Sequence, residues 1–77
     1  MSVRRFTVLL EYDPADEVWV SYVPALNHLS TYGDSREEAL AQTREAIAGY
    51  LEAAAKEGLA LPAVEPKTEL VELEVAV

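Results

Sequence analysis

The chain has 77 residues and no cysteine, and 14 acidic against 6 basic side chains give it a net charge of −8. A chain of this length supports one hydrophobic core, so we expect a single domain over residues 1–77, without disulfides or thiolate chemistry. Because so negative a field repels phosphate backbones, autonomous nucleic-acid binding is disfavoured. The charge suits a basic protein partner, although solubility is the commoner reason for an acidic surface.

The N-terminal residues lack the apolar stretch of a secretion signal, and no run approaches the ~20 apolar residues that a membrane helix needs. We therefore expect a cytoplasmic protein with no membrane partner.

Three strands are expected in the first half of the chain. Residues 3–12 and 17–23 alternate between two faces, and the run Asp13-Pro14-Ala15-Asp16 between them has turn chemistry, which predicts a β-hairpin. Pro24 ends the second strand because it has no N–H for the ladder, and a third short strand is expected near residues 28–32. The even-numbered side chains are expected to share one face: Phe6, Val8, Leu10, Tyr12, Val18, Val20 and Tyr22.

Residues 33–58 carry the start and stop signals of one long helix. Gly33 permits a tight turn, Ser35 can cap the helix, and Glu38 can reach back to the cap N–H, as in a capping box. Gly58 suits a left-handed stop. The sequence therefore predicts a helix from Arg36 to about Glu57 with one apolar stripe for packing.

Residues 68–77 alternate again and predict a last strand, which Pro62 and Pro66 separate from the helix. A lone amphipathic helix cannot bury its own apolar stripe, so it must lie across one sheet face. The expected fold is α+β, in the order β-β-β-α-β, with a mainly antiparallel sheet. Alternation leaves open whether the last strand pairs within its own chain or with a neighbour's. Gly49, in mid-helix, is equally consistent with a close backbone approach and with simple tolerance.

The carboxylate pairs that a hydrolase would need each have a structural explanation. One pair lies in the hairpin turn, one at the helix start and one on an exposed strand face: Asp13 with Asp16, Glu37 with Glu38, and Glu72 with Glu74. His28 is the only histidine and makes neither a zinc site nor a catalytic triad. We therefore expect no catalytic, metal or cofactor residues, and a metal nuclease is the weakest alternative.

An interface is the more promising kind of site. The alternation places Trp19 on the sheet face away from the helix, together with Leu9 and Leu70. An aromatic clustered with apolar side chains suggests a contact patch for a homodimer, a higher oligomer or another protein. His28 is either a strand-edge residue or part of such a partner surface.

The hairpin and helix sequences resemble a known family. Val23-Pro24-Ala25-Leu26, then Tyr32-Gly33-Asp34-Ser35 and the helix REEALAQTREAIAGYLEAAAKEG, are similar to the HicB-like antitoxins over about Phe6 to Pro62. The resemblance implies a partial ribonuclease-H-like fold without that fold's catalytic carboxylates. It also implies that the protein neutralises a small basic mRNA-cleaving toxin of the HicA type by covering it.

The chain departs from the family pattern in two places. After Pro66 only an acidic strand with Lys67 as its sole basic residue is expected, so the chain would be a short form lacking the usual C-terminal DNA-binding segment. Asn27-His28-Leu29 also replaces the family's usual loop. We expect a non-catalytic binding module that sequesters a toxin, or alternatively a self-associating interaction protein of the same fold without a toxin partner.

Overall fold

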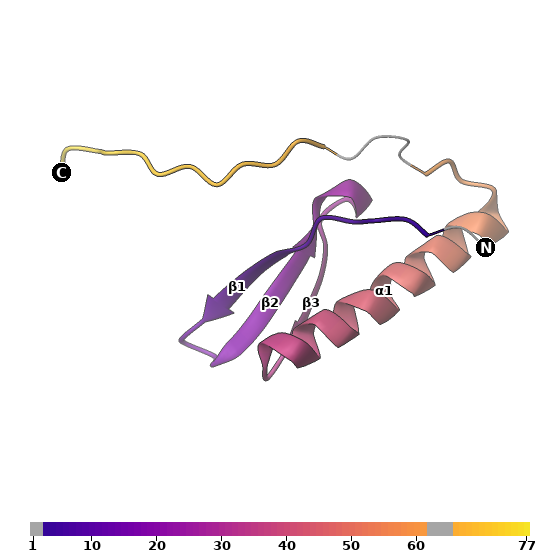
Figure 1. Ribbon diagram of the computed structural model, residues 1–77, viewed down its shortest axis with the longest axis horizontal. Helices are drawn as coiled ribbons and strands as arrows, with labels where there is room; N and C mark the ends of the chain where they lie inside the picture. The colour runs from indigo at the N-terminus through magenta and orange to yellow at the C-terminus, as the bar shows by residue number, and fades with distance from the viewer. Residues whose placement is uncertain (1–2, 62–65) are drawn as a thin grey trace.

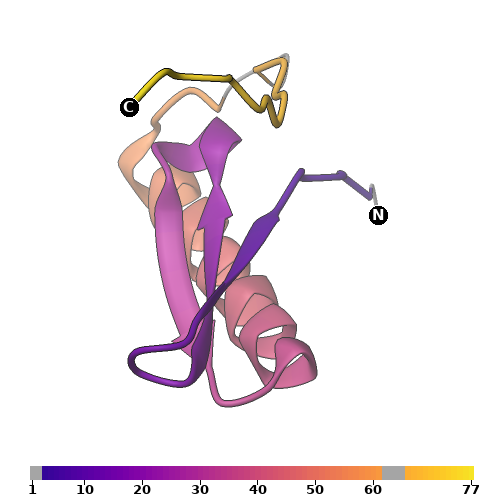
Figure 2. The same ribbon diagram turned by 90° about the vertical axis from the view of Figure 1, so that its left-hand side faces the viewer.

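A three-stranded antiparallel sheet with one long helix across a single face forms the body of the protein (Figures 1 and 2). The computed structural model describes residues 3–61 and 66–77. The elements in chain order are β1 (Leu9–Asp13), β2 (Val18–Val23), the 3₁₀ turn η1 (Pro24–Leu26), β3 (Leu29–Gly33) and α1 (Arg36–Glu57). The expected α+β class is confirmed.

The predicted hairpin is present, with a shorter first strand than expected. The Oδ1 atom of Asp13 accepts hydrogen bonds from the backbone N–H groups of Ala15 and Asp16, with N···O distances of 2.9 and 3.4 Å. These two bonds close the turn. β1 begins at Leu9 and not at residue 3. Its partner β2 stops before Pro24, which has no N–H for the ladder, so residues 3–8 run beyond the end of β2 as irregular chain.

The predicted sheet faces are wrong for β2. Asp13 pairs with Val18 across the hairpin, so even-numbered residues of β1 lie opposite odd-numbered residues of β2. Cross-strand partners share a face, and the hydroxyl of Ser21 contacts the helical Thr43 at 2.6 Å. The odd-numbered residues of β2 therefore face the helix. Val18, Val20 and Tyr22 lie on the other face, with Leu9.

The buried core is small and lies between β2, η1 and α1. Its buried apolar side chains are Val23, Leu26, Ala39 and Ala54. Gly33 ends β3 directly against the helix start, where an added Cβ would stand 2.5 Å from the backbone nitrogen of Ala39. A glycine is therefore required for the sheet and the helix to approach so closely.

The helix matches its predicted bounds at both ends. The hydroxyl of Ser35 accepts a hydrogen bond from the N–H of Glu38 at 3.0 Å, which confirms the Ser35 half of the capping box. Gly58 adopts a left-handed φ of 69°, and its N–H reaches the carbonyl groups of Ala54 and Ala55. The stop signal predicted at Pro62 lies outside the described residues.

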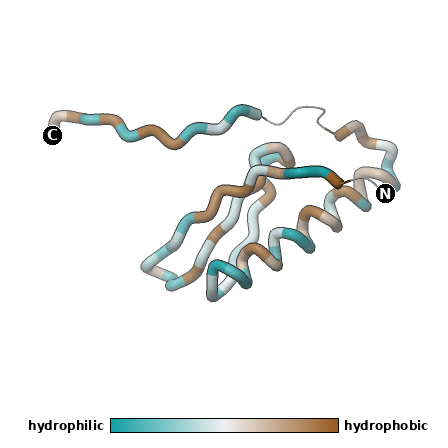
Figure 3. Tube along the Cα trace, viewed as in Figure 1, coloured by the Kyte–Doolittle hydropathy of each residue, from teal (hydrophilic) through white to brown (hydrophobic). Residues whose placement is uncertain are grey.

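The predicted last strand is not part of the sheet. Residues 66–77 are extended, belong to no helix or strand, and are exposed along their whole length. The segment runs away from the body as the long yellow trace of Figure 1, and its hydropathy alternates along the tube of Figure 3. In the described part of the chain the order is therefore β-β-β-α, because residues 68–77 pair with no strand there.

Candidate functional site

The sheet face opposite the helix, which we call the outer face, is not covered by any described element (Figure 2). Leu9, Tyr22 and Ser30 form one row across the three strands, and Glu11, Val20 and Tyr32 form the next. Asp13 and Val18 follow at the hairpin end. Tyr32 is 66% exposed, so its ring is available for contact with another molecule.

A shallow hollow of about 420 Å³ lies at the hairpin end of the outer face. Apolar side chains and two carboxylates line it together: Asp13, Asp16, Val18, Val20, Ser30, Thr31 and Tyr32. The lining contains no basic residue. The hollow is therefore suited to an apolar group carried next to a positive charge, as on the surface of a basic protein.

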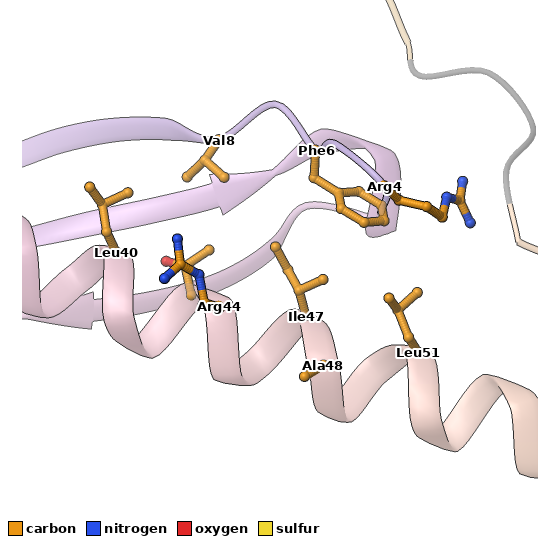
Figure 4. Close-up of a pocket in the computed structure, with 9 residues that line it drawn as sticks. Arg4, Phe6, Val8, Leu40, Arg44, Ile47, Ala48 and Leu51 are labelled. Atoms are coloured by element: carbon orange, nitrogen blue, oxygen red, sulfur yellow. The ribbon is translucent and has the colours of Figure 1, made fainter. Parts of the chain in front are cut away.

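A second depression, which we call the helix groove, lies between α1 and the chain that precedes β1 (Figure 4). It measures about 570 Å³, and its lining is Arg4, Phe6, Val8, Leu40, Thr43, Arg44, Ile47, Ala48 and Leu51. The guanidinium of Arg4 stands 5.3 Å from the centre of the Phe6 ring, a cation–π distance. Most of the groove wall is aliphatic, and among the described residues its two charged side chains are both basic.

The four residues predicted for an interface do not form one patch. Leu9 lies on the outer face, whereas Trp19 lies on the helix side of the sheet, where its ring is 5.4 Å from that of Tyr12. His28 is exposed in the turn before β3 with a positive φ of 58°. Leu70 is 91% exposed in the C-terminal segment. The expected common face for Leu9 and Trp19 is therefore wrong, and their interface roles stay predictions.

The carboxylates considered for catalysis are spread over separate elements. Asp13 closes the hairpin turn, Glu37 and Glu38 occupy the first helical turn, and Glu72 and Glu74 lie in the exposed C-terminal segment. Within residues 3–61 and 66–77, no three His, Asp or Glu side chains gather closely enough to hold a metal ion. In the same residues, no helix is both long and apolar enough to cross a membrane.

Sequence reasoning missed both depressions. The signal for the outer face was present in Val18, Val20 and Tyr32, which are apolar or aromatic residues at strand positions. To place them on one face, one must know which residues of β1 and β2 pair across the hairpin. The signal for the helix groove lies in Phe6 and Val8, whose alternation with polar residues equally fits a paired strand.

Comparison with models of known protein families, with curated proteins and with solved structures finds no match to this chain.

Proposed function

We propose that this chain is a non-catalytic protein-binding module of the antitoxin type, which holds a small basic mRNA-cleaving protein against its outer face. The observation that carries the proposal is the hollow at the hairpin end, where Asp13 and Asp16 border an apolar floor that includes Val20. Apolar contact retains a partner, and the carboxylates favour a basic one.

The net charge of the chain supports the same kind of partner. A net charge of −8 over 77 residues attracts a basic protein from a distance and repels nucleic acid. The order β-β-β-α is compatible with a partial ribonuclease-H-like fold of the HicB type, and we include that fold in the proposal. A toxin that cleaves mRNA acts in the cytoplasm, so the proposal places this protein there.

The experiment measures binding of the purified chain to the small basic protein encoded in the neighbouring reading frame, by isothermal titration calorimetry. We expect Tyr32→Ala to weaken binding at least about tenfold, because the ring is an exposed aromatic at the edge of the hollow. Tyr12→Ala is the matched control. Tyr12 is 50% exposed and does not line the hollow, so this change should leave the affinity within about twofold.

Two outcomes would contradict the proposal. One is the absence of any basic partner, with a pull-down that recovers only further copies of this chain. This result would instead favour the alternative of a self-associating interaction protein, which the exposed apolar side chains of residues 70–77 support. The other is an equal loss of affinity for both tyrosine variants, which would remove the outer face from the interface.

A further inference from the structure

The C-terminal segment has the pattern of a strand and exposes apolar side chains that a folded protein ordinarily covers. Val71, Leu73 and Val75 are 67%, 82% and 74% exposed, and Val77 at the chain end is fully exposed. At two-residue spacing these side chains share one face of an extended chain, and Glu72 and Glu74 share the other. Residues 68–77 therefore have the pattern of an amphipathic strand, and no described element covers their apolar face.

The helix groove matches the apolar face of this segment in chemistry and length. Leu40, Ile47 and Leu51 present their aliphatic side chains toward the groove from the same side of α1 (Figure 4). From Leu40 to Leu51 the helix rises about 16 Å, and the four alternate side chains from residue 71 to residue 77 span about 20 Å. The apolar face of the segment can therefore lie along the groove with its side chains between those of the helix.

The chain on the other wall of the groove can accept a strand beside it. β1 is an edge strand, because the sheet order is β1-β2-β3, and residues 3–8 prolong it past the end of β2. The edge of a sheet is where an additional strand adds most readily. Phe6 and Val8 turn their side chains into the groove from this prolongation.

The charges of the groove and of the segment are opposite. Arg4 and Arg44 line the groove, so two of the six basic residues of the chain lie there. The segment carries Glu69, Glu72 and Glu74 against a single basic residue, Lys67. Charge complementarity of this kind favours the acidic segment over a basic or neutral peptide as the occupant.

In a single copy the C-terminal segment does not occupy the helix groove, because none of residues 66–77 lines it. The radius of gyration is 14.9 Å and the longest extent 49 Å, whereas a compact domain of this length has a radius of gyration of about 11 to 12 Å. The segment leads away from the body that carries the groove (Figure 1).

We propose that residues 68–77 of one copy lie in the helix groove of a second copy, beside residues 4–8, and that the exchange is reciprocal in a twofold dimer. Exchange of an identical element is a low-cost route to a symmetric dimer. The dimer would cover the apolar side chains of the segment and enlarge the small core of each domain. This inference goes beyond the proposed function, because it uses the opposite side of the sheet and no foreign partner.

Native mass spectrometry and sedimentation equilibrium of the full chain test the proposal. We expect a dimer for the unchanged protein. Leu73→Asp should raise the dissociation constant at least about a hundredfold, because it places a charge on the face that enters the groove. Ala76→Asp is the matched control, because it adds the same charge to the same segment on the opposite face, and the dimer should persist. A monomeric unchanged protein, or a dimer that Leu73→Asp leaves intact, would overturn the proposal.

An isotope-filtered nuclear Overhauser experiment identifies which chain fills the groove. Protein labelled with ¹³C is mixed with unlabelled protein, unfolded and refolded together, and contacts between the methyl groups of Leu73 and those of Ile47 are recorded. We expect these contacts between labelled and unlabelled chains. Contacts confined to a single chain would show that the segment folds back on its own domain, and the exchange would be wrong.

Discussion

Small, buried side chains lie where α1 packs against the sheet. The buried hydroxyl of Thr43 lies 2.6 Å from the hydroxyl of Ser21 and 2.6 Å from the carbonyl oxygen of Ala39. Ser21 is fully buried, and its hydroxyl is also 3.4 Å from the carbonyl oxygen of Thr31. Ser21 and Thr43 are both small, and a pair of larger apolar side chains in their place would hold the helix farther from β2. Since buried polar groups are costly unless paired, this contact fixes the position of the helix on the sheet.

Two glycines of the domain are predicted to respond in opposite ways to the same change. Gly33→Ala should lower the free energy of unfolding by about 1 to 3 kcal/mol, because the new Cβ meets the rigid backbone of Ala39. Gly49→Ala should raise it by about 0.5 to 1 kcal/mol, because Gly49 is exposed in mid-helix and an added Cβ there meets nothing within 4 Å. Urea unfolding of both variants measures the difference.

The result also decides between the two explanations of Gly49. A close backbone approach is not what the structure shows, since the space around Gly49 is open. If Gly49→Ala destabilised the protein, that position would have to contact something beyond a single copy of the chain. Equal losses of stability in both variants would contradict the assignment of Gly33 as the close contact.

At the scale of the elements, local signals predicted α1 and the hairpin turn correctly. The bounds of α1 follow from Ser35 and Gly58, whose capping hydrogen bonds are made within a few residues of the chain. The turn follows from Asp13, whose carboxylate binds the two N–H groups that follow shortly after it. Such interactions depend on neighbouring residues alone, so they can be read without knowledge of the tertiary structure.

The faces of β2 and the fate of residues 68–77 could not be read in this way. Whether Val20 or Trp19 faces the helix depends on the number of residues in the hairpin turn, and a one-residue change reverses every side chain. Alternation in residues 68–77 indicates a strand and contains no information on its partner. The hollow on the outer face and the helix groove both depend on these long-range pairings. The sequence therefore predicted candidate interface residues, but not the surfaces on which they lie.

The cap of α1 gives a prediction at the level of this element. Ser35→Ala should lower the free energy of unfolding by about 1 kcal/mol, because the N–H of Glu38 loses its acceptor at the helix start. Ser35→Asp should stay within a few tenths of a kcal/mol of the unchanged protein, since aspartate caps as well as serine does. Denaturant unfolding measures both. A loss of stability as large for aspartate as for alanine would contradict a capping role.

At the scale of the whole molecule, the two sides of the sheet are suited to different contacts. The outer face has carboxylates around an apolar hollow and suits a basic protein. The helix groove has arginines around an aliphatic wall and suits the acidic C-terminal segment. Because the surfaces lie on opposite sides of the sheet, a dimer that uses the groove leaves both outer faces open. The proposed self-association and the proposed capture of a partner are therefore compatible in one assembly.

The excess of negative charge should make the rate of the proposed capture depend on salt. We expect the association rate constant with the basic partner to fall at least about tenfold between 50 and 500 mM NaCl, because salt screens the attraction that guides the encounter. The dissociation rate should change far less, since apolar contact retains the partner.

Asp16→Asn should reduce the association rate constant and its dependence on salt. Glu45→Gln, which removes the same charge from the exposed side of α1, should have a smaller effect. Stopped-flow fluorescence of Trp19 or of a labelled partner measures these rates. Equal effects of the two substitutions would show that the partner responds to net charge alone and that the hollow does not direct it.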